Sequence, residues 1–158
     1  MRVDLAVITG SATLRGNELR FAAPETGYVL RTLPTNLERI FVISAIGREE
    51  EVTDVASRIF LDSPSGCYLP IGVRGGEEGW STRTLDDGCC VARGLFRIVL
   101  PFRDEGTYTF SWAYGSESGS FPLRVDLVPL AGRSPAETPP RSSLRRRPSA
   151  GDAPRPVS

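Results

Sequence analysis

The sequence of 158 residues contains no lysine and no histidine, so all 19 of its basic residues are arginine. Without histidine, the chain can form neither a Ser-His-Asp triad nor a Cys-His pair, and it has no imidazole ligand for a metal. Without lysine, it can form neither a Walker A phosphate loop nor a Schiff base. The side chains left for catalysis are carboxylates, cysteine thiolates, hydroxyls and arginine.

Cysteine and long apolar runs are also scarce. Adjacent cysteines bridge only through a strained ring, so Cys67, Cys89 and Cys90 do not make a disulfide framework, which favours a reducing cytoplasm. No apolar run approaches the ~20 residues of a membrane-spanning helix, so no membrane association is expected. Asp4 interrupts the first apolar run and no cleavage-site pattern follows it, so we expect a first strand there and no signal peptide.

The charge is divided unevenly along the chain. Residues 1–130 carry 13 arginines and 17 acidic residues, a net charge of −4, whereas residues 131–158 carry six arginines and two acidic residues, a net charge of +4. The second segment also holds six of the 13 prolines and no aromatic residue. Because such a segment cannot bury enough apolar surface to offset its ordering entropy, we expect a folded domain over 1–130 and a disordered basic tail, rich in Arg, Pro and Ser, over 131–158.

The body of the chain has the alternation of apolar and polar residues that is typical of β-strands. Aromatic residues alternate with small ones over 107–114, alternation resumes over 121–127, and GSESG at 115–119 predicts a hairpin between them. Residues 38–47 are apolar on both faces, as a central strand would be. Further strands are expected over 2–8, 12–21 and 27–33, with Gly10, Gly16-Asn17, Pro24 and Pro34 as punctuation. Others are expected over 67–74, 80–84 and 94–101, the last of them stopped by Pro101.

Residues 49–60 are ambiguous, because a helical stripe fits them nearly as well as a strand does. The DSPSG turn at 62–66 and the β-branched content favour a strand over 54–62, with a helical turn before it. The whole pattern, short strands at regular spacing with no alternating helices, predicts an all-β fold. We expect a single antiparallel β-sandwich of about seven to nine strands.

A short motif before the aromatic strand carries a family resemblance. Asp104, Gly106 and Tyr108 spell D-x-G-x-Y, which resembles the tyrosine corner of immunoglobulin-like domains. The resemblance implies that Gly106 has an unusual backbone angle and that the Tyr108 hydroxyl satisfies a buried backbone group upstream. Phe110 stands where the family has its second core cysteine, so the inter-sheet disulfide is absent, which agrees with a cytoplasmic location.

The layout of residues 1–128 also resembles that of small, uncharacterised bacterial immunoglobulin-like proteins. These begin with a strand at the initiator methionine and end on a G-x-Y-x-F…PLRV hairpin, as Gly106 to Phe110 and residues 122–125 do here. The resemblance implies an immunoglobulin-like sandwich, and it brings no known active site with it.

Acidic clusters supply the first candidate sites. Loop carboxylates gathered at one end of a sandwich could bind calcium, although the D-x-D-x-D-G spacing is missing, and solvated loop charge is the simpler interpretation. A pair of carboxylates could also hydrolyse a glycoside, but a small sandwich offers little cleft for it. The clusters are Glu49-Glu50-Glu51-Asp54, Glu77-Glu78, Asp86-Asp87 and Asp104-Glu105.

Two further candidates lie in the body. Cys89 and Cys90 could form a redox or nucleophilic site if Arg83 or Arg93 lowered a thiol pKa, but cysteine more often simply packs in a core. Trp80 follows a glycine-rich loop and would be a binding anchor if exposed, although core packing fits it equally well. The aromatic stripe over 108–114 is typical of a sandwich core.

The tail motif SSLRRRPS supports two sharper hypotheses. Arg145, Arg146 and Arg147 could contact nucleic-acid phosphates or an acidic partner, and Ser149 follows R-R-P as in a basophilic kinase site, where a phosphate would reduce the positive charge. The alternatives are a solvated tail that keeps the domain soluble, or a basic tail that screens the acidic body.

The sequence therefore predicts a cytoplasmic, non-catalytic interaction or scaffold module with no cofactor and no metal. Its partner would be an unknown protein or a second copy of the chain, since open sheet edges in sandwiches pair readily. The alternatives are nucleic-acid binding through the tail, and a small enzyme that uses carboxylates or cysteine.

Overall fold

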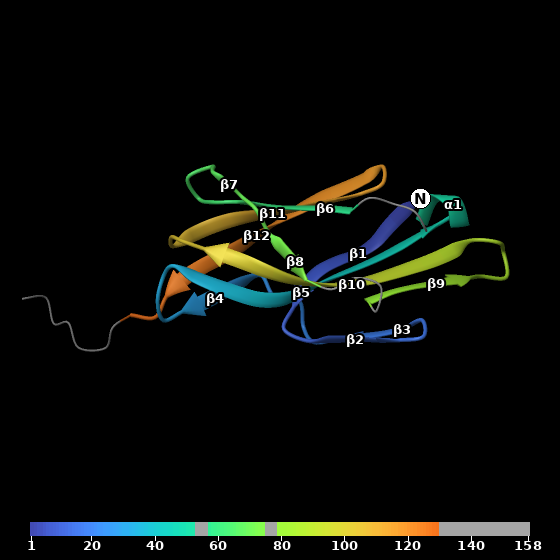
Figure 1. The fold of residues 1–158 in the computed structure, drawn as a ribbon, viewed down its shortest axis with the longest axis horizontal. Helices are drawn as coiled ribbons and strands as arrows, with labels where there is room; N and C mark the ends of the chain where they lie inside the picture. The colour runs from blue at the N-terminus through green and yellow to red at the C-terminus, as the bar shows by residue number, and fades with distance from the viewer. Residues whose placement is uncertain (53–56, 75–78, 130–158) are drawn as a thin grey trace, which may run out of the picture. The chain divides into compact units, whose positions relative to one another are not determined.

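A computed structural model describes residues 1–52, 57–74 and 79–129, and nearly all of their regular structure is β-strand (Figure 1). Met1–Val128 form one unit, and Pro129 begins a second unit, Pro129–Ser158. The predicted tail over 131–158 lies outside the described residues. In the described part, twelve strands and one short helix are present, more than the seven to nine strands expected.

The first sheet is built around two long strands, β5 (Thr35–Gly47) and β10 (Cys90–Phe102), which pair antiparallel along their whole length. β1 (Arg2–Thr9) lies on the other side of β5 and forms one edge. Two short strands pair with the other side of β10. β9 (Trp80–Thr84) pairs with the first residues of β10, and β8 (Gly72–Arg74) pairs with residues 97–99 of β10. As predicted, β5 is buried on both faces: every residue from Phe41 to Ala45 is at most 4% exposed.

The second sheet has the strand order β4-β12-β11-β6-β7. Its members are β4 (Gly27–Leu30), β12 (Glu117–Leu127), β11 (Gly106–Tyr114), β6 (Ser57–Asp62) and β7 (Tyr68–Leu69). All neighbours pair antiparallel except β4 and β12, which are parallel. The expectation of a wholly antiparallel fold is wrong at this pair. β4 and β12 are not joined by a hairpin: the chain crosses to the first sheet and back between them, so the two strands can run in the same direction.

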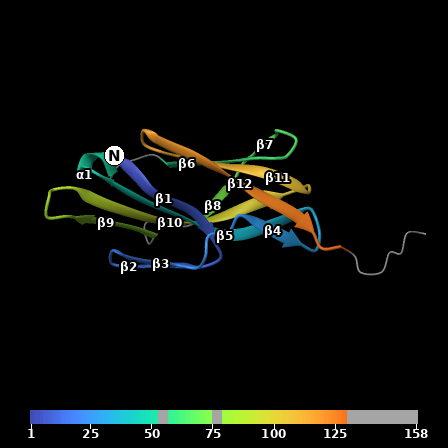
Figure 2. The same ribbon diagram turned by 180° about the vertical axis from the view of Figure 1, so that it is seen from behind.

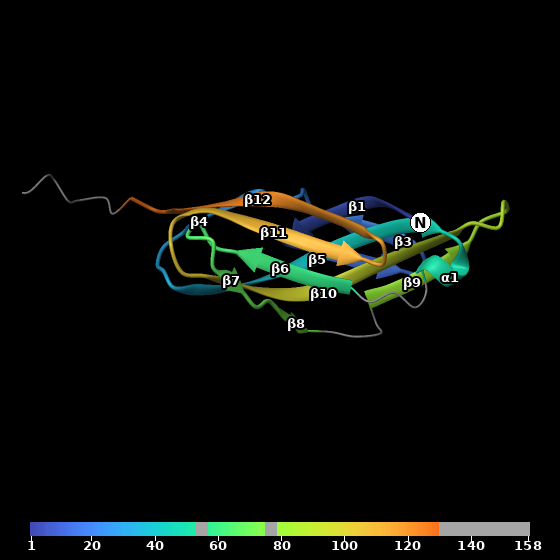
Figure 3. The ribbon, with the colours of Figure 1, turned by 90° about the horizontal axis from the view of Figure 1, so that it is seen from above.

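The two sheets lie one over the other (Figure 3). Their inward side chains form one core. β5 and β10 contribute Phe41, Ile43, Ile98 and Leu100 from one side, and β11 and β12 contribute Tyr108, Phe110, Leu123 and Val125 from the other. Each of these is at most 1% exposed. Burial of one such side chain is worth about 1.5–3 kcal/mol, so this core is the main source of stability. The prediction of an all-β fold with packed sheets is confirmed.

A separate hairpin, β2 (Ala12–Arg15) and β3 (Glu18–Phe21), lies on the side of the first sheet that faces away from β11 and β12 (Figures 1 and 2). Its turn begins at Gly16, whose φ of +58° is the value that a tight hairpin turn needs at its first position. The β-structure predicted over 12–21 is thus two strands, and the Gly16-Asn17 punctuation predicted within it is the turn between them.

Other strand limits also differ from the expectations. β10 continues through Pro101 to Phe102. On the side of β10 away from β5, the described pairing with β8 covers only residues 97–99. No described strand on that side therefore needs an N–H from Pro101. The strand expected over 67–74 is two strands, β7 and β8, which belong to different sheets and are separated by Pro70. The hairpin expected at 115–119 is tighter, because Tyr114 already pairs with Glu117 across a turn that contains Gly115 with φ +58°.

The short helix α1 (Glu49–Val52) confirms the predicted helical turn ahead of β6. It follows β5 directly, and its last residue, Val52, is buried in the core. Residues 53–56 lie outside the described part, so the expected start of the next strand at 54 is not described. No helix of the described ranges has the length and apolar character that crossing a membrane would need.

Candidate functional site

Tyr108 ties down the loop that precedes its own strand. Its fully buried hydroxyl accepts hydrogen bonds from the backbone N–H groups of Arg103 and Asp104, both at 2.9 Å, and donates one to the Asp104 carbonyl at 3.0 Å. Gly106 has φ +134°, and a Cβ there would lie 2.8 Å from Cγ of Pro64. The Tyr108 side chain thus holds the backbone of this loop, and Asp104 contributes its backbone N–H and carbonyl to these bonds.

Trp80 lies against the core at the start of β9. Its ring packs on Tyr114, at 5.6 Å between centroids, and on Phe96, at 6.2 Å, and the side chain is half-buried. The backbone of Gly94 runs directly beneath the ring, and a Cβ there would clash with it. Trp80 is therefore a packing residue at the edge of the core and not an exposed aromatic anchor.

The three cysteines lie in different environments and are all free. Cys67 is exposed, Cys89 is half-buried, and Cys90 is 2% exposed in the core. Arg93, one of the two expected activators, donates instead to the backbone carbonyl of Asn17. The described contacts of Cys90 are those of a packed core residue.

Three of the acidic loop residues accept hydrogen bonds from main-chain or terminal N–H groups. Glu51 accepts hydrogen bonds from the N-terminal ammonium at 3.0 Å and from the Arg48 N–H at 2.9 Å. Asp87 accepts from the Cys89 N–H and Glu105 from the Leu127 N–H. In the ranges that the structure describes, no three Asp, Glu or Cys residues lie close enough together to hold a metal ion. Asp54, Glu77 and Glu78 lie outside those ranges.

The tail candidates Arg145, Arg146, Arg147 and Ser149 also lie outside the described residues. The remaining candidate sites are recesses on the surface of Met1–Val128. The recesses described there include one on the outer face of the first sheet, one at an edge where both sheets end, and a smaller one on the β2–β3 hairpin that is lined by polar and charged side chains.

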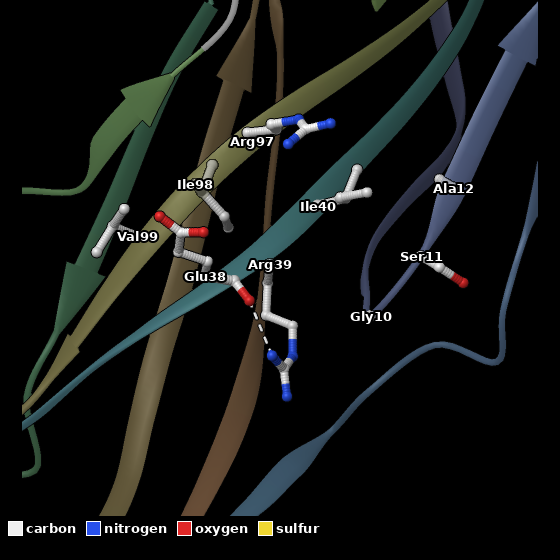
Figure 4. A pocket seen from close by; sticks show the side chains of 9 residues that line it. All are labelled: Gly10, Ser11, Ala12, Glu38, Arg39, Ile40, Arg97, Ile98 and Val99. Carbon is white, nitrogen blue, oxygen red and sulfur yellow. Dashed lines mark hydrogen bonds between the residues drawn. The ribbon is translucent and has the colours of Figure 1, made fainter.

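The first recess is a depression of about 390 Å³ over β5 and β10, beside the first residues of the β2–β3 hairpin (Figure 4). Ile40 and Val99 line it together with two exposed charged residues, Glu38 and Arg97. Arg39 turns away from Arg97 and donates to the Glu38 carbonyl at 2.8 Å. The depression combines apolar contacts with charges of both signs, which suits the binding of a polar segment.

Next to it, Glu25, Arg39 and Tyr28 form a half-buried cluster between the two sheets. The Arg39 Nε donates to Glu25 Oε2 at 2.6 Å, and the guanidinium lies 5.2 Å from the centre of the Tyr28 ring. Burial, and secondarily the Glu25 carboxylate, raises the pKa of the Tyr28 hydroxyl well above its usual value of 10. The cluster holds the segment before β4 against β5.

The second recess is an apolar groove of about 590 Å³ between β1 and β12. Ala6, Val7 and Ile8 of β1 form one wall, and Phe121 and Pro122 of β12 form the other. β4 covers the edge of β12 only from Arg124 onward, so the edge of β12 is open at Pro122. We refer to this recess as the β1–β12 groove.

Main-chain groups of β1 point into the β1–β12 groove. The Ile8 carbonyl faces away from β5, because it accepts a hydrogen bond from the Glu25 N–H at 2.8 Å. Residues two apart in a strand face the same way, so the N–H and C=O of Ala6 and the N–H of Ile8 also face outward. Among the described residues no hydrogen bond joins the N–H and C=O of Ala6, so these two groups form a short open edge. Ile8 is 0% exposed, so its N–H is not accessible.

Sequence reasoning did not find the β1–β12 groove. One wall had a local signal, since a proline inside a predicted strand marks an open edge, and Pro122 lies at such a position. The other wall had none, because which strand lies at the edge of a sheet depends on tertiary pairing.

Comparisons with known proteins add little to this geometry. No family model matches the chain, and a search of the curated proteins finds no match. Among solved structures, amylomaltase from Corynebacterium glutamicum is similar with a TM-score of 0.43 and 12% sequence identity, over 63% of this chain and 12% of that chain. The match thus spans only a small part of amylomaltase, and a likeness of this size shows neither the fold family nor the activity of this chain.

Proposed function

We propose that the described domain is an immunoglobulin-like, non-catalytic interaction module that binds an extended segment of a partner protein along β1. The observation that carries the proposal is the open main-chain edge at Ala6 beside the apolar β1–β12 groove. A strand that adds to a sheet needs free main-chain groups for affinity and apolar pockets for its alternate side chains.

The strand order supports the immunoglobulin-like part of the proposal. One sheet of an immunoglobulin domain has the strand order A-B-E-D. The first sheet here has the same order if β1 is taken as A, β5 as B and β10 as E, with β8 and β9, which both pair with β10, in the place of D. β6, β11 and β12 then take the places of C, F and G in the other sheet. The hydrogen bonds of Tyr108 at the start of β11 fit the tyrosine corner of strand F.

The edge of β1 is a better acceptor of a new strand than the edge of β12. Pro122 faces the open side of β12 and has no N–H to donate, whereas Ala6 offers both a donor and an acceptor. The regular part of β1 is short, because the register shifts between Val3 and Leu5 and the Ile8 carbonyl is already bonded. Such an edge supports few main-chain hydrogen bonds and so a weak, reversible interaction.

The test uses the full chain as bait for a displayed library of random linear peptides. We expect the enriched peptides to alternate apolar and polar residues and to broaden the backbone NMR signals of residues 5–8 and 121–123. Ala6→Pro removes one outward N–H while sparing the bonds to β5, and is expected to weaken the selected peptides roughly tenfold.

The matched control is Tyr68→Ala, which changes an exposed residue of β7 at the edge of the other sheet. Peptides that bind Ala6→Pro as tightly as the unchanged chain would contradict the proposal. A chain that pairs with itself through β1 would instead appear as a dimer in sedimentation, which Ala6→Pro would dissociate.

The free state of all three cysteines supports the further proposal that the module works in a reducing compartment such as the cytoplasm.

A further inference from the structure

The outer face of the first sheet carries a strip of buried side chains that does not belong to the main core. Val42, Ser44 and Val91 are 0%, 4% and 7% exposed. Their chain neighbours Phe41, Ile43, Ala45, Cys90 and Ala92 all belong to the core between the sheets. Because side chains alternate along a strand, the strip points away from that core.

The β2–β3 hairpin is what covers this strip. It lies on that side of the sheet (Figures 1 and 2), and its half-buried residues Ala12, Leu14 and Leu19 alternate with exposed ones. β2 and β3 pair only with each other among the described strands, so no ladder joins them to the sheet that they cover. A two-stranded hairpin on its own is marginally stable, so its position depends on the contacts at its two ends.

The stem of the hairpin is well bonded. The buried Thr9 hydroxyl donates to the Ala22 carbonyl at 3.1 Å and lies 3.3 Å from the Ser11 carbonyl. The Ala22 N–H also donates to the Ser11 carbonyl, at 3.0 Å. These bonds close the loop at the point where the hairpin leaves and rejoins the domain.

The tip is held differently. Arg93, which pairs with Ser44 across the sheet, donates from Nη1 to the backbone carbonyl of Asn17 in the hairpin turn. Its Nε and the Oδ1 of Asn17 are buried, and neither has a hydrogen-bond partner among the described residues. No ion pair of Arg93 is present in the described part either. Water would satisfy both groups once the tip lifted, so the closed tip carries a penalty that opening removes.

We propose that the β2–β3 hairpin is a hinged cover, with its hinge at Thr9 and its latch at Arg93 and Asn17. Opening of the tip uncovers Val42, Ser44 and Val91. The uncovered strip is continuous with Ile40 on the same strand, and so enlarges the depression of Figure 4, whose wall includes Gly10, Ser11 and Ala12 of the hairpin stem. The cover would therefore control how much of this apolar face is accessible, independently of the β1–β12 groove.

The test measures thiol alkylation at the covered strip under native conditions. Ser44→Cys places a thiol beneath the tip, and the native Cys90, on the core face of β10, reports opening of the whole domain. Iodoacetamide labelling at each position is followed by mass spectrometry of proteolytic peptides and normalised to its rate in denaturant. We expect labelling at residue 44 to be roughly tenfold faster than at Cys90, since local opening costs less than global unfolding.

Two changes at the latch distinguish a cover from a fixed layer. In the Ser44→Cys chain, Asn17→Asp gives the half-buried Arg93 a carboxylate partner and is expected to slow labelling at 44 roughly tenfold. Arg93→Ala removes the donor and is expected to accelerate labelling. Labelling at Cys90 should change much less in both. Arg97→Ala is the control, because Arg97 lies on the same face of β10 but is exposed and away from the tip. Equal rates at residues 44 and 90, or rates at 44 that Asn17→Asp leaves unchanged, would overturn the proposal.

Discussion

The hydroxyl of Tyr114 donates a hydrogen bond of 2.6 Å to the carbonyl of Val52, which lies 62 residues earlier in the chain. Tyr114 ends β11 in the second sheet, and Val52 ends the short helix that follows β5 of the first sheet. The bond is buried, since both side chains are at most 1% exposed. It therefore joins β11 of the second sheet to the helix that follows β5 by a buried polar contact.

Loss of this bond should destabilise the domain. Tyr114→Phe keeps the ring but leaves the Val52 carbonyl buried without its donor, which costs about 1–3 kcal/mol. We expect a lower free energy of unfolding in urea with an unchanged slope. Tyr68→Phe is the control, because Tyr68 is 58% exposed and its change should stay within about 0.5 kcal/mol. Equal stability of the two variants would contradict this account.

The stability should also fall at alkaline pH. Burial, and secondarily the neighbouring Cys90, raises the pKa of Tyr114 to about 12, and burial raises that of Tyr28 as well. A raised pKa in the folded state means that the stabilisation is complete below pH 10, the usual pKa of tyrosine, and is lost as the pH rises toward 12. Urea unfolding at a series of pH values should show this decline, and Tyr114→Phe should reduce its slope.

Tyr108 should matter for the loop more than for the strand. Tyr108→Phe removes three hydrogen bonds to the backbone of Arg103 and Asp104. We expect a loss of about 1–3 kcal/mol, with faster amide hydrogen exchange at residues 103 and 104. If amide hydrogen exchange at residues 103 and 104 stayed unchanged, the loop would not depend on the Tyr108 hydroxyl.

Gly106 combines a positive φ with a close neighbour. Gly106→Ala places a Cβ at φ +134° and within 2.8 Å of Pro64, so we expect a loss above about 1 kcal/mol. Gly66→Ala is the matched control, because Gly66 has φ +80° and open space around its Cβ position. Thermal unfolding should rank Gly106→Ala well below Gly66→Ala, and the reverse order would argue against the Pro64 contact.

Glu51 should contribute to stability toward acid. The Arg48 backbone N–H, followed by the N-terminal ammonium, holds the pKa of Glu51 below its usual value of 4.5. A lowered pKa in the folded state means that this stabilisation is present above pH 4.5 and is lost as the pH falls through the folded value. Glu51→Gln, in a chain with a free amino group at Met1, should flatten the acid limb of the stability curve, whereas Glu50→Gln should not.

Local patterns in the sequence were enough to predict most strands. The alternation over 107–114 and 121–127 gave β11 and β12, and the doubly apolar run over 38–47 gave the buried part of β5. Where the predictions were wrong, the local signal did not specify the pairing. Pro101, expected to stop a strand, is accommodated within β10 because the adjacent edge of β10 has no partner there among the described strands.

The chain's composition and periodicity by themselves determined that the body is all-β and which faces of its longest strands are apolar, because both follow from residue type and a two-residue repeat. Only the tertiary structure decided that Ala6 and Pro122 flank the same groove, and that Arg93 lies under the turn at Asn17. These contacts join residues from distant parts of the chain. Their closeness depends on which strands pair and at which edges the sheets end, and no local pattern encodes that choice.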